Sequence, residues 1–162
     1  MVYLIDSHCH LQDVVAPRRT DAAPLPPKGP ERQRVLLKEA LARARRCGVT
    51  HFLSIACTPQ EFAPLYEAAA PESNVFFACG MHPLNLKDQP DWSEDELRAC
   101  LRRERVLALG ETGLDYHYSS DNRREQLDSF ARQIALAREL KLPMVIHARE
   151  AGDDKLALFK SE

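Results

Sequence analysis

The sequence lacks the long apolar and basic segments that mark membrane and secreted proteins. No stretch of about 18 consecutive apolar residues occurs, so we expect no membrane-spanning helix. The N-terminus, MVYLIDSHCH, has no basic segment ahead of an apolar one, which argues against a secretory signal peptide. The net charge of -2 gives no overall attraction for nucleic acid, so any such binding must depend on a local patch or on metal ions.

Closely spaced cysteine pairs are also absent. The five cysteines are odd in number and form no C-x-x-C motif, which argues against a zinc knuckle and against a disulfide framework. Reduced thiols in a cytoplasmic protein are the simpler interpretation. With 162 residues, 44% of them hydrophobic and 28% charged, the chain is expected to fold as a single domain over residues 1–162.

Short apolar runs alternate with helical segments along the chain. The runs predicted as strands are residues 2–6, 50–56, 74–79, 106–109 and 144–146. The segments predicted as helices are residues 31–47, 58–70, 93–104, 123–141 and 153–160. Because parallel strands need crossover helices, about five such βα units predict an α/β fold with a parallel sheet and outer helices. A complete TIM-type barrel needs eight units and about 250 residues, so the expectation is a partial (β/α)8 barrel.

Two features qualify this prediction. An open, doubly wound sheet is the structural alternative, but it usually carries a glycine-rich phosphate loop after the first strand. Here the first strand leads into histidines instead. Residues 16–30 (APRRTDAAPLPPKGP) contain five prolines and are therefore predicted to form a surface loop without regular structure.

Two histidines follow the first predicted strand. In an extended chain, side chains two residues apart point to the same side, so His8 and His10 face one way and Cys9 the other. Two imidazoles that converge at the end of a strand can bind one divalent ion. An isolated H-x-H is more often a chance pair of surface histidines, but its position directly after an apolar strand favours a metal site.

A carboxylate and a third histidine occupy similar positions after later strands. Glu111 follows the fourth predicted strand, where barrel enzymes place catalytic groups, and its two oxygens are able to bridge two cations. The alternative is an exposed acid in a glycine-containing loop. His147 ends the fifth strand, where a satisfied core histidine is the alternative. Asp115 is either an acceptor behind the ligands or a loop-forming residue, and we favour the structural role.

Other residues near these strand ends are candidates for binding substrate. Arg149 is expected on the same side as His147 and is suited to a phosphate or an acid. His82 is as consistent with a phosphate contact as with a loop histidine. Tyr116, Tyr118 and Trp92 are able to stack on a base, although loop aromatics commonly serve local packing.

Four motifs together carry a resemblance to a known family. DSHCHL, CGMHPLN, ALGETGLDYHY and LPMVIHAREA, in this order, resemble the TatD family of metal-dependent deoxyribonucleases, from residue 1 to about residue 158. The resemblance implies an amidohydrolase-like (β/α)8 barrel that hydrolyses DNA phosphodiesters. It further implies that His8 and His10 bind one metal, that His147 binds a second, and that Glu111 bridges both as the catalytic residue. Such mixed ligands suit Mg²⁺, Mn²⁺ or Zn²⁺.

The sequence departs from the family pattern at its C-terminal end. The family adds a histidine after strand six and an aspartate in an E-T-D-type motif, and both would lie beyond Glu162. We therefore expect a truncated chain with weak or no activity, whose open sheet edges favour self-association. Two alternatives remain. One is a small-molecule amidohydrolase or phosphoesterase on the same plan, and the other is a fragment that binds DNA or metal without catalysis.

Overall fold

The computed structural model describes residues 3–14 and 30–161. The predicted proline-rich loop at residues 16–30 therefore lies outside the described residues, except for Pro30, which begins a helix. None of the helices in the described ranges combines the length and the apolar character needed to cross a bilayer.

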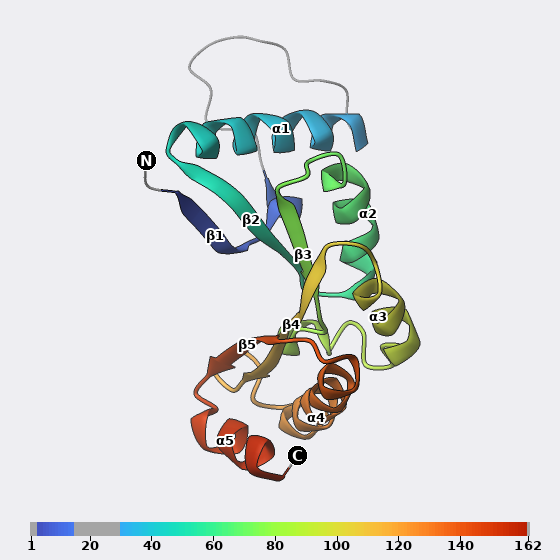
Figure 1. Cartoon of the computed structure of the whole chain (residues 1–162). Helices are drawn as coiled ribbons and strands as arrows, with labels where there is room; N and C mark the ends of the chain where they lie inside the picture. The colour runs from blue at the N-terminus through green and yellow to red at the C-terminus, as the bar shows by residue number, and fades with distance from the viewer. Residues whose placement is uncertain (1–2, 15–29, 162) are drawn as a thin grey trace.

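Five strands form one parallel sheet, and each strand pairs with the next one along the chain (Figure 1). The strands are β1 (Leu4–Cys9), β2 (Val49–Ala56), β3 (Val75–Cys79), β4 (Val106–Asp115) and β5 (Met144–Arg149). The sheet curls, so that the edge strands β1 and β5 lie on the same side of β3 in Figure 1. A curled parallel sheet with helices outside it confirms the predicted partial barrel.

The helices are α1 (Pro30–Arg46), α2 (Pro59–Ala69), α3 (Glu94–Leu101), α4 (Arg123–Leu140) and α5 (Gly152–Ser161), with 3-10 turns η1 (Leu11–Asp13) and η2 (Pro83–Asn85). Helices α1 to α4 connect successive strands on the outer face of the sheet, and α5 follows the last strand. Local sequence explains several starts. The Thr58 hydroxyl accepts from the Glu61 N–H with Pro59 in the first turn, and the Ser93 hydroxyl accepts from the Glu96 N–H.

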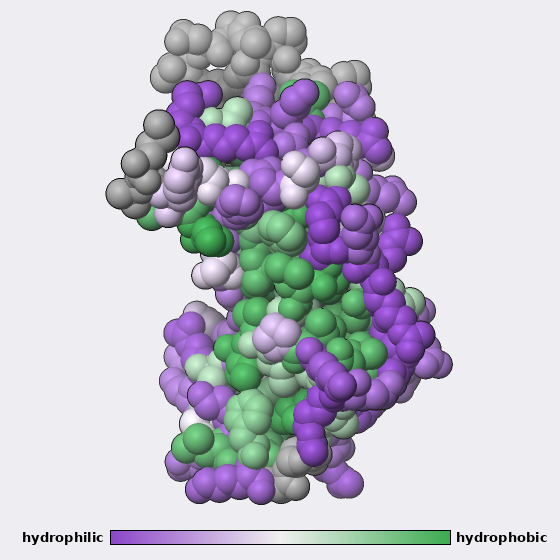
Figure 2. All heavy atoms as spheres, viewed as in Figure 1, coloured by the Kyte–Doolittle hydropathy of each residue, from purple (hydrophilic) through white to green (hydrophobic). Residues whose placement is uncertain are grey.

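Apolar side chains pack on both faces of the sheet. On the outer face, Phe77 and Leu109 pack with helix residues such as Leu97, and all three are fully buried. On the inner face, Ile55, Ala78 and Ala108 form a smaller cluster. Hydrophobic residues also gather in the middle of the face shown in Figure 2, with hydrophilic residues above and below them. Each buried leucine or phenylalanine stabilises the fold by about 1.5–3 kcal/mol, so this packing holds the helices against the sheet.

The strands β1, β4 and β5 extend further than predicted, and the extension of β4 matters most for the site. The strand β4 was expected to end at residue 109, but it continues to Asp115 because its C-terminal half pairs with β5. Glu111 is therefore part of the strand and not of a following loop. β1 likewise continues beyond residue 6 to Cys9, and β5 continues beyond residue 146 to Arg149. These boundaries were wrong because long-range pairing, and not local propensity, sets them.

Gly113 permits the close pairing of β4 with β5. Its backbone has a φ of +138°, and a Cβ added there would lie 2.0 Å from the carbonyl oxygen of His147. That atom belongs to the backbone of the neighbouring strand, so it cannot move aside without disturbing the sheet. Gly113 thus allows the backbone of β5 to lie close to β4 at His147, with which it pairs in the sheet.

We expect Gly113→Ala to lower the free energy of unfolding by at least about 2 kcal/mol, because the methyl group overlaps a strand backbone at an unfavourable φ. Gly152→Ala is the matched control, since a Cβ at that position meets nothing within 4 Å. Urea unfolding monitored by circular dichroism measures both variants. Equal stabilities for the two variants would contradict this account of Gly113.

Candidate metal centre

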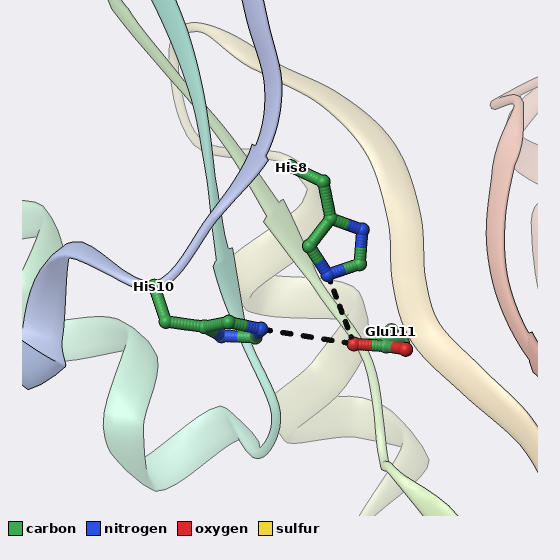
Figure 3. Close-up of side chains that lie close together, drawn as sticks. All are labelled: His8, His10 and Glu111. Atoms are coloured by element: carbon green, nitrogen blue, oxygen red, sulfur yellow. Dashed lines mark ion pairs between the residues drawn. The ribbon is translucent and has the colours of Figure 1, made fainter.

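Glu111 lies at the centre of a cluster of histidines at the C-terminal ends of the strands. Its carboxylate is largely buried, with 9% of the residue exposed. Nε2 of His8 in β1 lies 3.2 Å from Oε2 of Glu111, and Nε2 of His10 lies 3.8 Å from the same oxygen (Figure 3). Both rings point at Glu111, as expected for residues two apart in an extended chain.

The other carboxylate oxygen faces two further histidines. Nδ1 of His147 in β5 lies 3.2 Å from Oε1 of Glu111, and Nε2 of His82 lies 4.0 Å from it. The His82 and His147 rings contact each other edge to face, with centroids 4.5 Å apart. The structure thus brings the predicted residues His8, His10, Glu111 and His147 together, and places His82 beside them.

The donor atoms fit divalent cations. Two ligand atoms of one cation lie no more than about 4.2 Å apart, because each metal–ligand bond is about 2.1 Å. The separations of 3.2 to 4.0 Å around Glu111 satisfy this limit. Two overlapping groups, His8–His10–Glu111 and His82–Glu111–His147, have possible ligand atoms that all lie within 4.8 Å of one another, and Glu111 belongs to both. Imidazole and carboxylate donors suit zinc and the neighbouring divalent metals.

The His10 ring is oriented by the main chain of β2. Its Nδ1 lies 3.1 Å from the carbonyl oxygen of Ile55, which also accepts a 2.9 Å hydrogen bond from the Gln12 side chain. In the tautomer in which Nδ1 donates to this carbonyl oxygen, which can only accept, the proton of the neutral ring is on Nδ1. Nε2 then presents its lone pair toward Glu111, as a metal ligand requires.

Asp115 lies behind the cluster and is fully buried. Its Oδ2 is 2.8 Å from Nε2 of His147, and its Oδ1 accepts the backbone N–H groups of His117 and Tyr118. Burial by itself raises the pKa of this carboxyl, but the hydrogen bonds from Tyr118 and His147 outweigh it and lower the pKa below its usual value. Asp115 is therefore an ionised acceptor beside His147.

Two buried glutamines on α4, which the sequence analysis missed, hold the surrounding loops. The Gln133 side chain accepts the N–H of Met81 and donates to its carbonyl oxygen. Gln126 makes the same pair of hydrogen bonds with the backbone of Asp115. Both lie in the stripe that also contains Phe130. The sequence signal for them was the presence of glutamines in an otherwise apolar stripe of the helix, because a buried amide requires hydrogen-bond partners.

The predicted substrate-binding residues at the end of β5 lie in an exposed neighbourhood. The guanidinium of Arg149 lies 4.6 Å from the ring centroid of Tyr118, whose side chain is 63% exposed. The Tyr116 hydroxyl instead donates to Asp154, and the guanidinium of Arg123 lies over its ring. Tyr118 is therefore the more accessible aromatic surface, while the polar end of Tyr116 already has a partner.

Cys57, which lies beside the cluster, and His51, which lies far from it, are not suited to its chemistry. Sγ of Cys57 is 3.9 Å from Nδ1 of His10, but burial followed by the nearby Glu61 raises the pKa of this thiol to about 12, so it stays protonated. All five cysteines are free in the structure. His51 lies near the start of β2, at the end of the strand opposite the cluster, and stacks on Phe76.

Imidazoles and a carboxylate gathered at the C-terminal rim of a barrel-type sheet define the class of metal-dependent hydrolases with a TIM-barrel plan. The profile of the TatD related DNase family matches residues 5–162. The chain belongs to the TatD family, as its four motifs predicted.

Relatives of this chain agree with the assignment. YcfH of Escherichia coli K12, named as an uncharacterised metal-dependent hydrolase, is 34% identical over 161 residues, which cover 99% of this chain and 55% of YcfH. TatD of Klebsiella pneumoniae strain 342, named as a 3'-5' ssDNA/RNA exonuclease, is 34% identical over 125 residues, which cover 75% of this chain and 46% of that protein. The chain thus spans about half the length of the curated relatives it matches.

Solved structures show the same fold. The TatD homologue YjjV of E. coli K12 superposes with a TM-score of 0.77 at 28% identity, over 97% of this chain and 55% of YjjV. A TatD-family hydrolase of Entamoeba histolytica gives a TM-score of 0.75 at 21% identity, over 98% of this chain and 54% of that one. The likeness to the second protein concerns the fold alone.

In the metal-free protein we expect acid to destabilise the fold through His82. Burial, followed by the neighbouring His147, lowers the pKa of His82 from 6.5 to about 4. The unfolded chain then binds a proton more readily, so the contribution of His82 to stability is present above about pH 6.5 and is lost as the pH falls toward 4. His82→Gln should lose less stability than the wild type between pH 7 and pH 4.5, as measured by thermal unfolding in EDTA.

His51→Gln is the control for this titration, since His51 lies at the other end of β2. Its acid destabilisation should match that of the wild type. An NMR titration in which His82 titrates near pH 6.5 would contradict the expectation.

Proposed function

We propose that this protein is a metal-dependent nuclease that hydrolyses phosphodiester bonds in DNA. The observation that carries the proposal is the placement of Glu111, one oxygen of which faces His8 and His10 while the other faces His147. A carboxylate placed in this way is able to bridge two cations. The nuclease name of the related Klebsiella protein supports nucleic acid as the substrate.

The proposed ligands are His8 and His10 for one cation, His147 for a second, and Glu111 for both. Divalent cations bound there would activate water and neutralise charge that develops on the phosphate oxygens. The residues of the chain itself position these parts. The backbone of β2 orients His10, and the packed strands hold Glu111 where the rings of both edge strands reach it.

Substrate contacts are proposed for His82 and Arg149, and for the aromatic residues beside them. Nε2 of His82 points into the cluster, where it is able to donate to a phosphate oxygen. Arg149 offers a planar set of N–H donors suited to a second phosphate. Its stacking partner Tyr118 presents an exposed ring on which a base of single-stranded DNA can stack, and Tyr116 is proposed as a further substrate contact.

We expect slow, Mn²⁺- or Mg²⁺-dependent cleavage of a labelled single-stranded oligonucleotide by the purified chain. Glu111→Gln should lower the rate by at least about 100-fold, because it removes charge from the ligand common to both cations. Glu139→Gln, a surface carboxylate paired with Arg98, is the control and should keep the wild-type rate. Hydrolysis of amides or sugar phosphates with DNA left intact would overturn the proposal in favour of a small-molecule hydrolase.

We also propose that the 162 residues self-associate through the edges of the sheet. Among the described strands, β1 pairs only with β2 and β5 only with β4. Tyr3, Leu4 and Ile5 at one edge are 49% to 70% exposed, which leaves apolar surface beside unpaired strand backbone.

Sedimentation velocity should therefore show a mass that rises with protein concentration, and Ile5→Lys should shift the chain toward monomer. Leu84→Lys replaces an exposed apolar residue on η2, away from both edges, and should behave as the wild type. A monomer at all concentrations would contradict the prediction.

A further inference from the structure

His147 is held at both ends of its ring. Its Nδ1 lies 3.2 Å from Oε1 of Glu111, and its Nε2 lies 2.8 Å from Oδ2 of Asp115. Glu111 belongs to the cluster that is proposed to bind metal, whereas Asp115 lies behind it and is fully buried. One ring nitrogen of His147 therefore faces the proposed cation site, and the other faces a buried hydrogen-bond acceptor.

The hydrogen bond to Asp115 decides that Nε2 of His147 carries a proton. An ionised carboxylate only accepts hydrogen bonds, so the short contact with Oδ2 requires an N–H at Nε2. Nδ1 faces the Glu111 carboxylate, and its lone pair becomes the one directed into the cluster when a cation takes the place of a proton there. Oδ1 of Asp115 accepts from the backbone of His117 and Tyr118, so anchoring the loop needs only this one oxygen. The contact of Oδ2 with His147 is additional to that structural role.

His82 presents the opposite end of its ring to the same place. Its Nδ1 accepts the backbone N–H of Leu84 at 3.2 Å, so the neutral ring carries its proton on Nε2. That N–H is the end of the ring that faces Oε1 of Glu111. His82 and His147 belong to the same group of possible ligands, but of these two rings the hydrogen bonds leave only His147 free to direct a lone pair at a cation.

We propose that Asp115 is a positioning residue that fixes His147 as the Nε2–H tautomer and so directs the Nδ1 lone pair at a divalent cation beside Glu111. In the same cluster, His82 serves as an N–H donor and not as a metal ligand. This role of Asp115 rests on the metal site proposed above. It also explains why a carboxylate, and not an amide, occupies a fully buried position behind the cluster.

Asp115→Asn separates the positioning role from loop formation. The two backbone N–H groups at Oδ1 require an acceptor, so the amide oxygen of the asparagine takes that place. Its NH2 group then faces Nε2 of His147, and two donors cannot share a hydrogen bond. We expect the ring to move its proton to Nδ1, which removes the lone pair from the cation site while the loop keeps its hydrogen bonds.

Two measurements test the inference. Long-range ¹H–¹⁵N correlation spectra of the metal-free protein, with the His147 signals assigned from a His147→Gln variant, should show an Nε2–H ring in the wild type and an Nδ1–H ring in Asp115→Asn. His82 should remain Nε2–H in both and is the internal reference. Calorimetric titration with Mn²⁺ should show affinity about 10–100-fold weaker for Asp115→Asn. Asp154→Asn, which alters a carboxylate bound to Tyr116, should leave both readouts unchanged.

The possible failures are distinguishable. An Nδ1–H tautomer of His147 in the wild type overturns the inference, and this result does not depend on the folding of any variant. A reversed tautomer in Asp115→Asn with unchanged Mn²⁺ affinity overturns the link between Asp115 and the cation. A wild-type protein that binds no Mn²⁺ overturns the proposed metal site, and with it the role of Asp115 toward that site, whichever tautomer His147 adopts.

Discussion

The convergence of both edge strands on one carboxylate is the constraint on which the site depends. Glu111 is largely buried on β4, and a buried carboxylate is costly unless donors or cations face it. Of the imidazole rings around it, His8 lies on β1 and His147 on β5, the first and last strands of the described sheet. They reach the same carboxylate only because the sheet curls. The curvature of the fold and the chemistry of the site are thus two aspects of one geometry.

The sequence was sufficient to predict the members of the cluster. His8 and His10 are two apart in an extended segment, and Glu111 and His147 follow the apolar cores of later strands. Parallel strands bring such positions to one rim, so residue type and strand order together were enough. The separations of 3.2 to 3.8 Å between these rings and the carboxylate agree with that expectation.

The contacts that orient the cluster were not predictable in the same way. β4 was expected to stop before Glu111, because Gly110 and Gly113 are typical of loops, yet pairing with β5 extends it to Asp115. Only this extension places Asp115 against His147. It was interpreted as a structural residue, and the contacts of Oδ1 agree with that role, but its second oxygen has a partner 32 positions away in the chain. No local pattern encodes a contact of this kind.

The two glutamines of α4 each form hydrogen bonds with the backbone at the rim of the sheet. Gln126 and Gln133 are seven residues apart, which is two helical turns or about 10.5 Å of helix rise. One holds the backbone of Asp115 and the other that of Met81, next to His82. One rigid helix thus contacts both parts of the rim, in addition to the direct pairing of β3 with β4. A displacement of α4 would therefore move both parts of the rim together.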